Sequence, residues 1–168
     1  MSIDTTSAVR HRLVTRSDFD GLVCAALLKE LGLLDDILFV HPKDMQDGKV
    51  EIGPQDITTN LPYVASAHLV FDHHHSETLR NGLAPNHVID ATAPSAARVV
   101  YDHFGGAERF PDITDELMRA VDQADSAAYS LDDVLNQFPR PPRVFVLRFS
   151  GDANTAAQWT ADRWRDRA

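Results

Sequence analysis

Long apolar runs and cysteine pairs are missing from this sequence of 168 residues. Its longest uncharged apolar stretch, Leu22 to Leu28, is far shorter than the roughly 20 residues that a membrane-spanning helix needs. The lone Cys24 cannot form an internal disulfide, and positions 1–9 lack the charged start and apolar stretch of a signal peptide. We therefore expect a soluble, cytoplasmic protein that does not enter a membrane, with Cys24 as a small buried hydrophobic residue.

Positive charge is also scarce. The sequence has 16 lysines and arginines against 25 aspartates and glutamates, and its formal net charge is −9. A surface of this sign repels the phosphates of extended nucleic acid, which argues against a broad nucleic-acid-binding face. Carboxylates that surround divalent cations would reverse the local sign and admit a small anionic ligand. Because ordinary solubility explains the acid excess equally well, any site has to be found from motifs.

Two common catalytic motifs are absent as well. The sequence contains no Gly-x-Ser-x-Gly, the nucleophile turn of serine hydrolases, and no Gly-x-x-x-x-Gly-Lys phosphate loop. What is present is a globular composition, with 43% hydrophobic residues in a chain of one-domain length. We expect that domain at positions 1–136. A divergent tail rich in arginine and proline follows at positions 137–168, and we expect no second, substrate-binding domain.

Short apolar runs alternate with helical patterns through most of the chain. The expected strands lie at 11–16, 36–41, 57–61, 68–71 and 87–90. The expected helices lie at 22–31, 94–104 and 112–122, and the segment 43–54 is expected to be a loop or short hairpin. This order predicts an α/β fold, with a mostly parallel sheet, helices on both faces and ligands at the carboxyl ends of the strands. In the tail, we expect an edge strand at 144–147 and a final helix at 156–167.

Polar residues follow two of these expected strands. Asp18 and Asp20, with Gly21 beside them, lie in a strand-to-helix loop and can project both carboxylates toward one pocket, although the same pattern also fits an ordinary helix cap. Asp72-His73-His74 follows an apolar strand, where packing does not explain it. Imidazole and carboxylate together suit transition-metal ions. A solvated turn and a structural zinc site are the alternatives, and the lack of cysteines disfavours zinc.

Three segments of the sequence resemble the DHH superfamily of phosphoesterases. That superfamily includes exopolyphosphatases, family II inorganic pyrophosphatases, oligoribonucleases, cyclic-dinucleotide phosphodiesterases and single-strand exonucleases. The most specific match is 71–77, with the letters FDHHHSE, and the second is 15–21, with the letters TRSDFDG. The third is 120–127, with the letters AVDQADSA, where the family places a late aspartate after a helix. The resemblance spans about positions 10–136.

The resemblance implies a pair of divalent ions, usually manganese, magnesium or cobalt, with manganese expected here. Two such ions lie about 3.5–4 Å apart, share a bridging hydroxide and promote in-line displacement at phosphorus. Carried over by position, Asp18 would bind one ion, and Asp20 and His73 would bind the other. Asp125 would complete the second site. Asp72 is counted with these metal-site residues because it would orient the loop or a ligand.

Two positions depart from the family pattern. Arg16 stands where a histidine or aspartate ligand is normal, and it cannot bind a cation, although its planar fork could hold a substrate phosphate. Asn60 stands where the family has a bridging aspartate. His74 would contact a phosphate oxygen, so His74 and Arg16 are the expected catalytic residues. The candidate replacements for the missing carboxylate are Asp44, Asp47 and Asp56.

The sequence therefore predicts a metal-dependent phosphohydrolase that acts on phosphoanhydride or phosphodiester bonds by two-metal activation of water. The expected substrate is a small phosphate compound, either polyphosphate or a short nucleotide. The alternative is a catalytically impaired metal- or ligand-binding module with the DHH fold, and a purely structural α/β domain is the third hypothesis. The sequence leaves open the substrate, the number and identity of the metals, a homo-oligomeric state and whether the tail is native.

Overall fold

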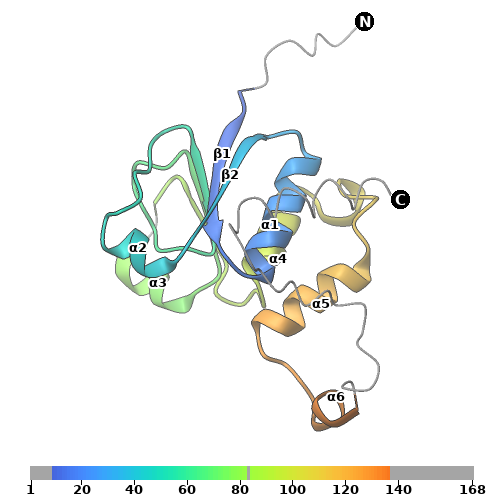
Figure 1. Cartoon of the computed structure of the whole chain (residues 1–168). Helices are drawn as coiled ribbons and strands as arrows, with labels where there is room; N and C mark the ends of the chain where they lie inside the picture. The colour runs from blue at the N-terminus through green and yellow to red at the C-terminus, as the bar shows by residue number, and fades with distance from the viewer. Residues whose placement is uncertain (1–8, 83, 137–168) are drawn as a thin grey trace, which may run out of the picture.

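A parallel sheet forms the centre of the molecule, which we describe from a computed structural model covering residues 9–82 and 84–136. Its strands are β1 (His11–Arg16), β2 (Leu34–Val40), β3 (Asp56–Thr59), β4 (Leu69–Asp72) and β5 (His87–Ile89). They lie in the order β2-β1-β3-β4-β5, and every neighbouring pair is parallel (Figure 1). The predicted parallel sheet is confirmed, and all carboxyl ends of its strands share one edge.

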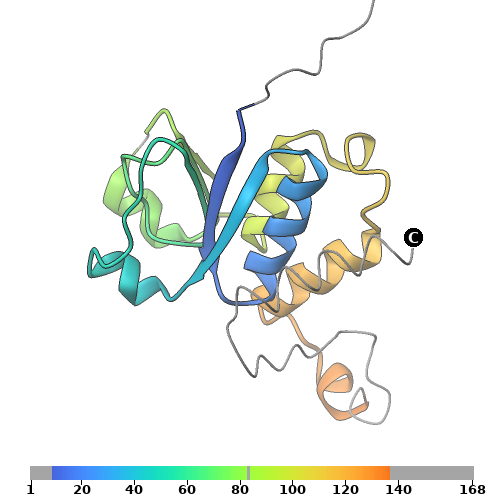
Figure 2. The same cartoon turned by 45° about the horizontal axis from the view of Figure 1, so that its top comes forward.

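Helices cover both faces of this sheet, as the β-then-α order predicts (Figures 1 and 2). One face carries three helices that pack on one another: α1 (Phe19–Glu30), α4 (Ala96–His103) and α5 (Asp115–Asp125). The other face carries the short helices α2 (Pro42–Gln46) and α3 (His75–Asn81), and α6 (Leu131–Asn136) follows α5. No helix within residues 9–82 and 84–136 is long and apolar enough to cross a membrane.

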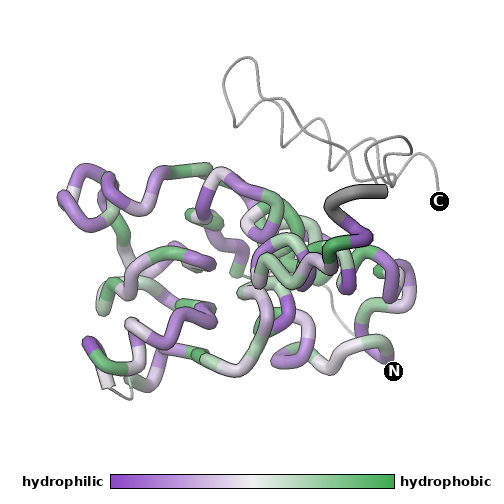
Figure 3. Tube along the Cα trace, turned by 90° about the horizontal axis from the view of Figure 1, so that it is seen from below, coloured by the Kyte–Doolittle hydropathy of each residue, from purple (hydrophilic) through white to green (hydrophobic). Residues whose placement is uncertain are grey.

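The larger core lies between the sheet and α1, α4 and α5. It is filled by apolar side chains that solvent hardly reaches, among them Leu13, Leu27, Phe71, Val100 and Met118. A smaller cluster on the opposite face contains Val14, Val40, Met45 and Leu61. Figure 3, coloured by hydropathy, shows mainly apolar or intermediate residues where the helices crowd together and many hydrophilic residues in the outer loops. Cys24 is fully buried in the larger core, as predicted.

The ends of two helices decide where polar side chains meet. Helix α1 begins at Phe19, earlier than expected, because Asp18 caps it by accepting a hydrogen bond from the backbone N–H of Gly21. Asp20 therefore lies in its first turn. Helix α5 is capped by Thr114, as predicted, but it continues to Asp125 instead of ending at position 122.

One local prediction was wrong. The segment 43–54, expected to be a loop or hairpin, begins inside helix α2. Pro42 occupies the first turn, where its fixed φ favours a helix, and the Nδ1 of His41 accepts a hydrogen bond from the backbone N–H of Lys43. The tail at 137–168, including the expected strand at 144–147 and helix at 156–167, lies outside the described residues.

Candidate metal centre

Polar side chains gather at the carboxyl edge of the sheet, above its central strands. Thr15 of β1 aligns with Thr59 of β3, and Thr59 aligns with Phe71 of β4, so the residues that follow these three strands lie at the same level. The hydroxyls of Thr15 and Thr59 are hydrogen-bonded at 2.6 Å directly beneath this edge. This alignment brings the loop of the first aspartate pair next to the Asp-His-His loop.

Asp20 is anchored by the start of helix α4. One carboxylate oxygen accepts a hydrogen bond from the backbone N–H of Ala96 at 3.0 Å, and the other accepts one from Ala97 at 2.7 Å. The side chain is almost completely buried. Burial raises the pKa of Asp20 to about 7 against the opposing effect of the N–H group of Ala97, and the negative charge of Asp125 adds to the rise. A cation beside Asp20 would stabilise its ionised form and offset the free-energy cost of burying the negative charge.

The Nε2 atom of His73 faces the carboxylate of Asp125. The Nδ1 of the same ring lies 3.2 Å from the carbonyl oxygen of Ala93 and donates a hydrogen bond to it, so in the neutral ring the lone pair is on Nε2. Burial lowers the pKa of His73, but the contact with Asp125 outweighs burial and raises this pKa above its ordinary value. Nε2 faces a carboxylate oxygen of Asp125 at 2.9 Å. Within the described part of the chain, this buried Nε2 makes no hydrogen bond of acceptable geometry. Either a proton on Nε2 or a metal ion bound by both groups would satisfy these two atoms.

Asp20, His73 and Asp125 together meet the requirements of a divalent metal site. Each offers one ligand atom, and these atoms all lie within 4.8 Å of one another. Two carboxylates and one neutral imidazole are ligands of the type that manganese, iron, cobalt and zinc accept. Backbone groups of Ala93 and Ala97 hold two of the three side chains in place. The structure thus brings together three of the five predicted metal-site residues, which we call the Asp-His-Asp group.

Asp18 lies outside the Asp-His-Asp group and has other partners. One of its oxygens accepts the capping hydrogen bond from Gly21, and the other lies 2.8 Å from Nε of Arg16. The side-chain amide nitrogen of Asn60 lies 3.4 and 3.5 Å from the two oxygens. Burial raises the pKa of Asp18, against the hydrogen bond from Gly21 and the charge of Arg16.

Asp72 also lies outside the Asp-His-Asp group and orients its neighbours instead. One fully buried oxygen accepts hydrogen bonds from the backbone N–H groups of His73 and His74. The same oxygen lies 2.7 Å from Nδ1 of His74. This contact raises the pKa of His74, whose side chain remains 43% exposed. These are the contacts that an orienting role requires.

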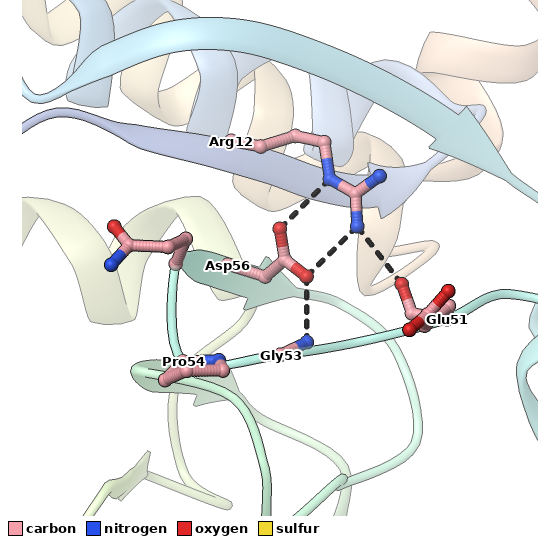
Figure 4. Close-up of a pocket in the computed structure, with 6 residues that line it drawn as sticks. Arg12, Glu51, Gly53, Pro54 and Asp56 are labelled. Carbon is pink, nitrogen blue, oxygen red and sulfur yellow. Dashed lines mark hydrogen bonds and ion pairs between the residues drawn. The ribbon is translucent and has the colours of Figure 1, made fainter.

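None of the candidate replacement carboxylates belongs to the Asp-His-Asp group. Asp56 begins β3 and lies at the amino end of the sheet, where both oxygens bind the guanidinium of Arg12 at 2.8 Å (Figure 4). This ion pair lines a pocket of about 390 Å³. Asp44 pairs with Lys49, and Asp47 pairs with Lys43. Their charges are therefore already compensated locally.

The backbone groups that position the ligands were missed by the sequence reasoning. They belong to Ala93, Ala96 and Ala97, and no side-chain pattern marks them in advance. Gly21 was singled out beside the two aspartates, and the structure adds the reason that it is needed for close packing. A Cβ there would lie 2.0 Å from the carbonyl oxygen of Arg16.

The comparisons with known proteins support the interpretation of these motifs. No protein-family model and no curated protein matches the chain. Among solved structures, the pGpG-specific phosphodiesterase PggH from Vibrio cholerae matches with a TM-score of 0.75 and 52% sequence identity. The match covers 92% of this chain and 52% of PggH, so the chain spans about half the length of that protein. The predicted resemblance is thereby confirmed, and the chain belongs to the DHH superfamily of phosphoesterases.

Proposed function

We propose that this chain is a metal-dependent phosphodiesterase that cleaves short linear nucleotides such as pGpG. The Asp-His-Asp group carries this proposal, because one imidazole and two carboxylates offer ligand atoms that all lie within 4.8 Å of one another. The identity of 52% with a pGpG-specific phosphodiesterase supports a phosphodiester substrate over a phosphoanhydride one. Polyphosphate has no comparable support.

Asp20, His73 and Asp125 would hold a divalent ion, with Mn²⁺ as the first choice and Mg²⁺ or Co²⁺ as alternatives. When bound, such an ion polarises a phosphoryl oxygen and makes water a better nucleophile at neutral pH. The chain's own contribution is to fix the ligands. The carbonyl of Ala93 holds the Nδ1 side of the His73 ring, so that Nε2 would face the metal, and the first turn of α4 holds Asp20.

His74 and Arg16 would bind the substrate phosphate. Asp72 holds the His74 ring through Nδ1 and favours its protonated form, so Nε2 can donate a hydrogen bond to a phosphate oxygen. Arg16 is anchored through Nε to Asp18, and its terminal nitrogens have no partner within residues 9–82 and 84–136. Both side chains place positive charge where a phosphodiester gains negative charge during displacement.

A binding module without turnover is the second candidate. The observation that favours it is the Arg16–Asp18 ion pair, which occupies one predicted metal ligand. Both candidates predict that a divalent ion raises the melting temperature, because a ligand that binds only the folded state stabilises it. Only the phosphodiesterase predicts that nucleotide is consumed.

The test is hydrolysis of pGpG by the 168-residue chain with Mn²⁺, followed by chromatography of the released mononucleotide. Replacing His73 with Asn should lower the rate by more than the roughly 10–100-fold that loss of an outer metal-site partner costs. The exposed neighbour His75 provides the matched control, and His75→Asn should keep the parent rate. Equal rates for His73→Asn and the parent would refute the proposal, and metal binding without hydrolysis would favour the binding module.

Asp20→Ala is a less suitable probe of the same idea. Its carboxylate accepts backbone hydrogen bonds from both Ala96 and Ala97, so the alanine variant leaves two buried N–H groups unsatisfied. Each such group costs about 1–3 kcal/mol. The variant should lose stability as well as metal binding, and a fall in activity alone could not separate the two effects.

A further inference from the structure

Asp18 and Asp20 are chemically identical side chains two positions apart, yet they have opposite surroundings. Both oxygens of Asp18 already have donors, one from the backbone of Gly21 and the other from the Nε of Arg16. Asp20 pairs with no lysine or arginine in the described part of the chain, and neither does Asp125. The charge of Asp18 is therefore balanced by an arginine of the protein, whereas no lysine or arginine of the described residues balances Asp20 or Asp125.

We propose that the site binds one divalent cation, held by Asp20, His73 and Asp125, and that the guanidinium of Arg16, anchored on Asp18, takes the place of a second cation. This inference rests on the proposed function and specifies which positive groups balance the negative charge of the substrate phosphate. A divalent ion on Asp18 would first have to displace an ion pair of 2.8 Å that places a permanent positive charge at that carboxylate.

Asn60 supports the same arrangement from the neighbouring strand end. Its side chain is 2% exposed, and its φ of 54° is in the left-handed region that asparagine tolerates better than most residues. Its amide nitrogen points at the two oxygens of Asp18. The flipped amide would set an oxygen against that carboxylate, so the donor orientation is the favourable one. A carboxylate at position 60 would need a cation between it and Asp18, whereas the amide does not.

The terminal N–H groups of Arg16 remain available to bind the substrate phosphate, which is the role that a second ion would have. The side chain is 44% exposed, and Nε alone is engaged by Asp18. The remaining N–H groups form a planar fork that matches two oxygens of a phosphate. A phosphodiester would then lie between the cation of the Asp-His-Asp group and this fork. The substrate class that fits is a small nucleotide whose phosphate can reach the exposed side chains of Arg16 and His74.

The test counts Mn²⁺ ions per chain in the full-length protein, by elemental analysis after dialysis against Mn²⁺. The parent should hold one equivalent, with the electron-paramagnetic-resonance pattern of an isolated ion. Asp125→Asn should lose it. Asp18→Asn, which keeps a good helix cap, should still hold one equivalent. Two equivalents in the parent, or the loss of an ion in Asp18→Asn, would overturn the proposal.

A second pair of variants examines Arg16 and Asn60 themselves. The double variant Arg16→Asp with Asn60→Asp replaces a cation and an amide by two carboxylates beside Asp18, and it should gain a second equivalent of Mn²⁺. If it stays at one equivalent, these residues do not exclude the second ion and the proposal fails. Arg16→Lys keeps the charge but not the fork, so it should hold one equivalent and raise KM for pGpG by roughly 10- to 100-fold.

These outcomes separate the inference from the proposed function. Two bound ions together with hydrolysis of pGpG would leave the phosphodiesterase intact and overturn only the one-ion arrangement. No bound ion and no hydrolysis would overturn both. An unchanged KM in Arg16→Lys would overturn the role of the guanidinium as a phosphate ligand.

Discussion

The Nε2 of His73 and a carboxylate oxygen of Asp125 face each other at 2.9 Å, with the ring proton held on the opposite nitrogen by the carbonyl of Ala93. The two residues come from different parts of the chain, one at the end of β4 and the other in the last turn of α5. Nearby Asp20 adds a further carboxylate. The folded chain thus brings together acceptor atoms that repel one another unless a proton or a metal ion lies between them.

The first prediction concerns Asp125→Asn. The variant removes one of the two carboxylates of the Asp-His-Asp group, neither of which has a lysine or arginine partner among the described residues, so the metal-free protein should melt at the parent temperature or slightly above it. In the parent, Mn²⁺ at about 100 times its Kd should add about 2.7 kcal/mol of stability, and the variant should lose this gain. Calorimetric melting with and without Mn²⁺ measures both effects.

The exposed Asp112 gives the control for this prediction, since Asp112→Asn changes the net charge equally at a position away from the Asp-His-Asp group. It should keep the Mn²⁺-dependent rise in melting temperature. An equal rise in Asp125→Asn would show that Asp125 is not a ligand.

Much of this arrangement follows from local sequence. Polar residues directly after apolar strands predict a site at the carboxyl edge of a parallel sheet, and Asp18, Asp20 and the Asp72-His73-His74 run all lie there. The cap at Thr114 was also predictable, because a hydroxyl before a helical pattern is a local signal. These features depend only on residues close together in the chain.

The remaining features depend on packing between distant segments. Asp125 reaches His73 because α5 continues to residue 125 and packs against α1 and α4, which no local pattern specifies. The pairing of Arg16 with Asp18 requires the direction of both side chains. Asp56 is instructive in a different way. It is the first residue of β3, so its place at the amino end of the sheet follows once the start of this strand is known.

Gly21 provides a second prediction, about close packing beneath the site. A Cβ at this position would lie 2.0 Å from the carbonyl oxygen of Arg16 and 2.7 Å from the hydroxyl of Thr15. Gly21→Ala should therefore destabilise the protein by about 3 kcal/mol, at the upper end of what overpacking usually costs. Because the same shift moves the loop that carries Asp18 and Asp20, Mn²⁺ affinity should fall as well.

Gly53→Ala is the matched control, because nothing lies within 4 Å of a Cβ built there. Its free energy of unfolding should stay within about 0.5 kcal/mol of the parent, as is usual for surface substitutions. Urea denaturation of the two variants provides the comparison. Equal stabilities would mean that the β1–α1 loop can move aside at little cost.

The third prediction concerns the coupling of Asp72 with His74. If Asp72 acts by holding the His74 ring at 2.7 Å, then Asp72→Asn and His74→Asn should each lower kcat/KM for pGpG. The double variant should be hardly worse than His74→Asn alone, because the orienting group has nothing left to orient. Steady-state kinetics of the three variants measures this coupling. Fully additive losses would give Asp72 a role of its own, such as direct metal binding.

The last prediction concerns the pH dependence of stability at the opposite edge of the sheet. Burial of Asp56 opposes its ionisation, but the hydrogen bonds from Arg12 and the N–H of Gly53 outweigh burial and lower the pKa of Asp56 below its ordinary value. A carboxyl group with a lowered folded-state pKa contributes stability above its unfolded-state pKa and loses it as the pH falls through the folded-state value. The gain is therefore complete near pH 6 and lost in strong acid.

Asp56→Asn should accordingly cost about 1–2 kcal/mol at neutral pH, since charged hydrogen bonds are worth about 1.5–3 kcal/mol and Arg12 is partly exposed to solvent. The difference from the parent should shrink as urea denaturation is repeated below pH 4. Comparing the two proteins at each pH cancels the opposite contribution of Asp20. Asp35→Asn, whose pairing with Arg10 at 3.7 Å is exposed, should show neither effect. A difference that stays constant down to pH 2 would mean that Asp56 stabilises the fold through packing instead of charge.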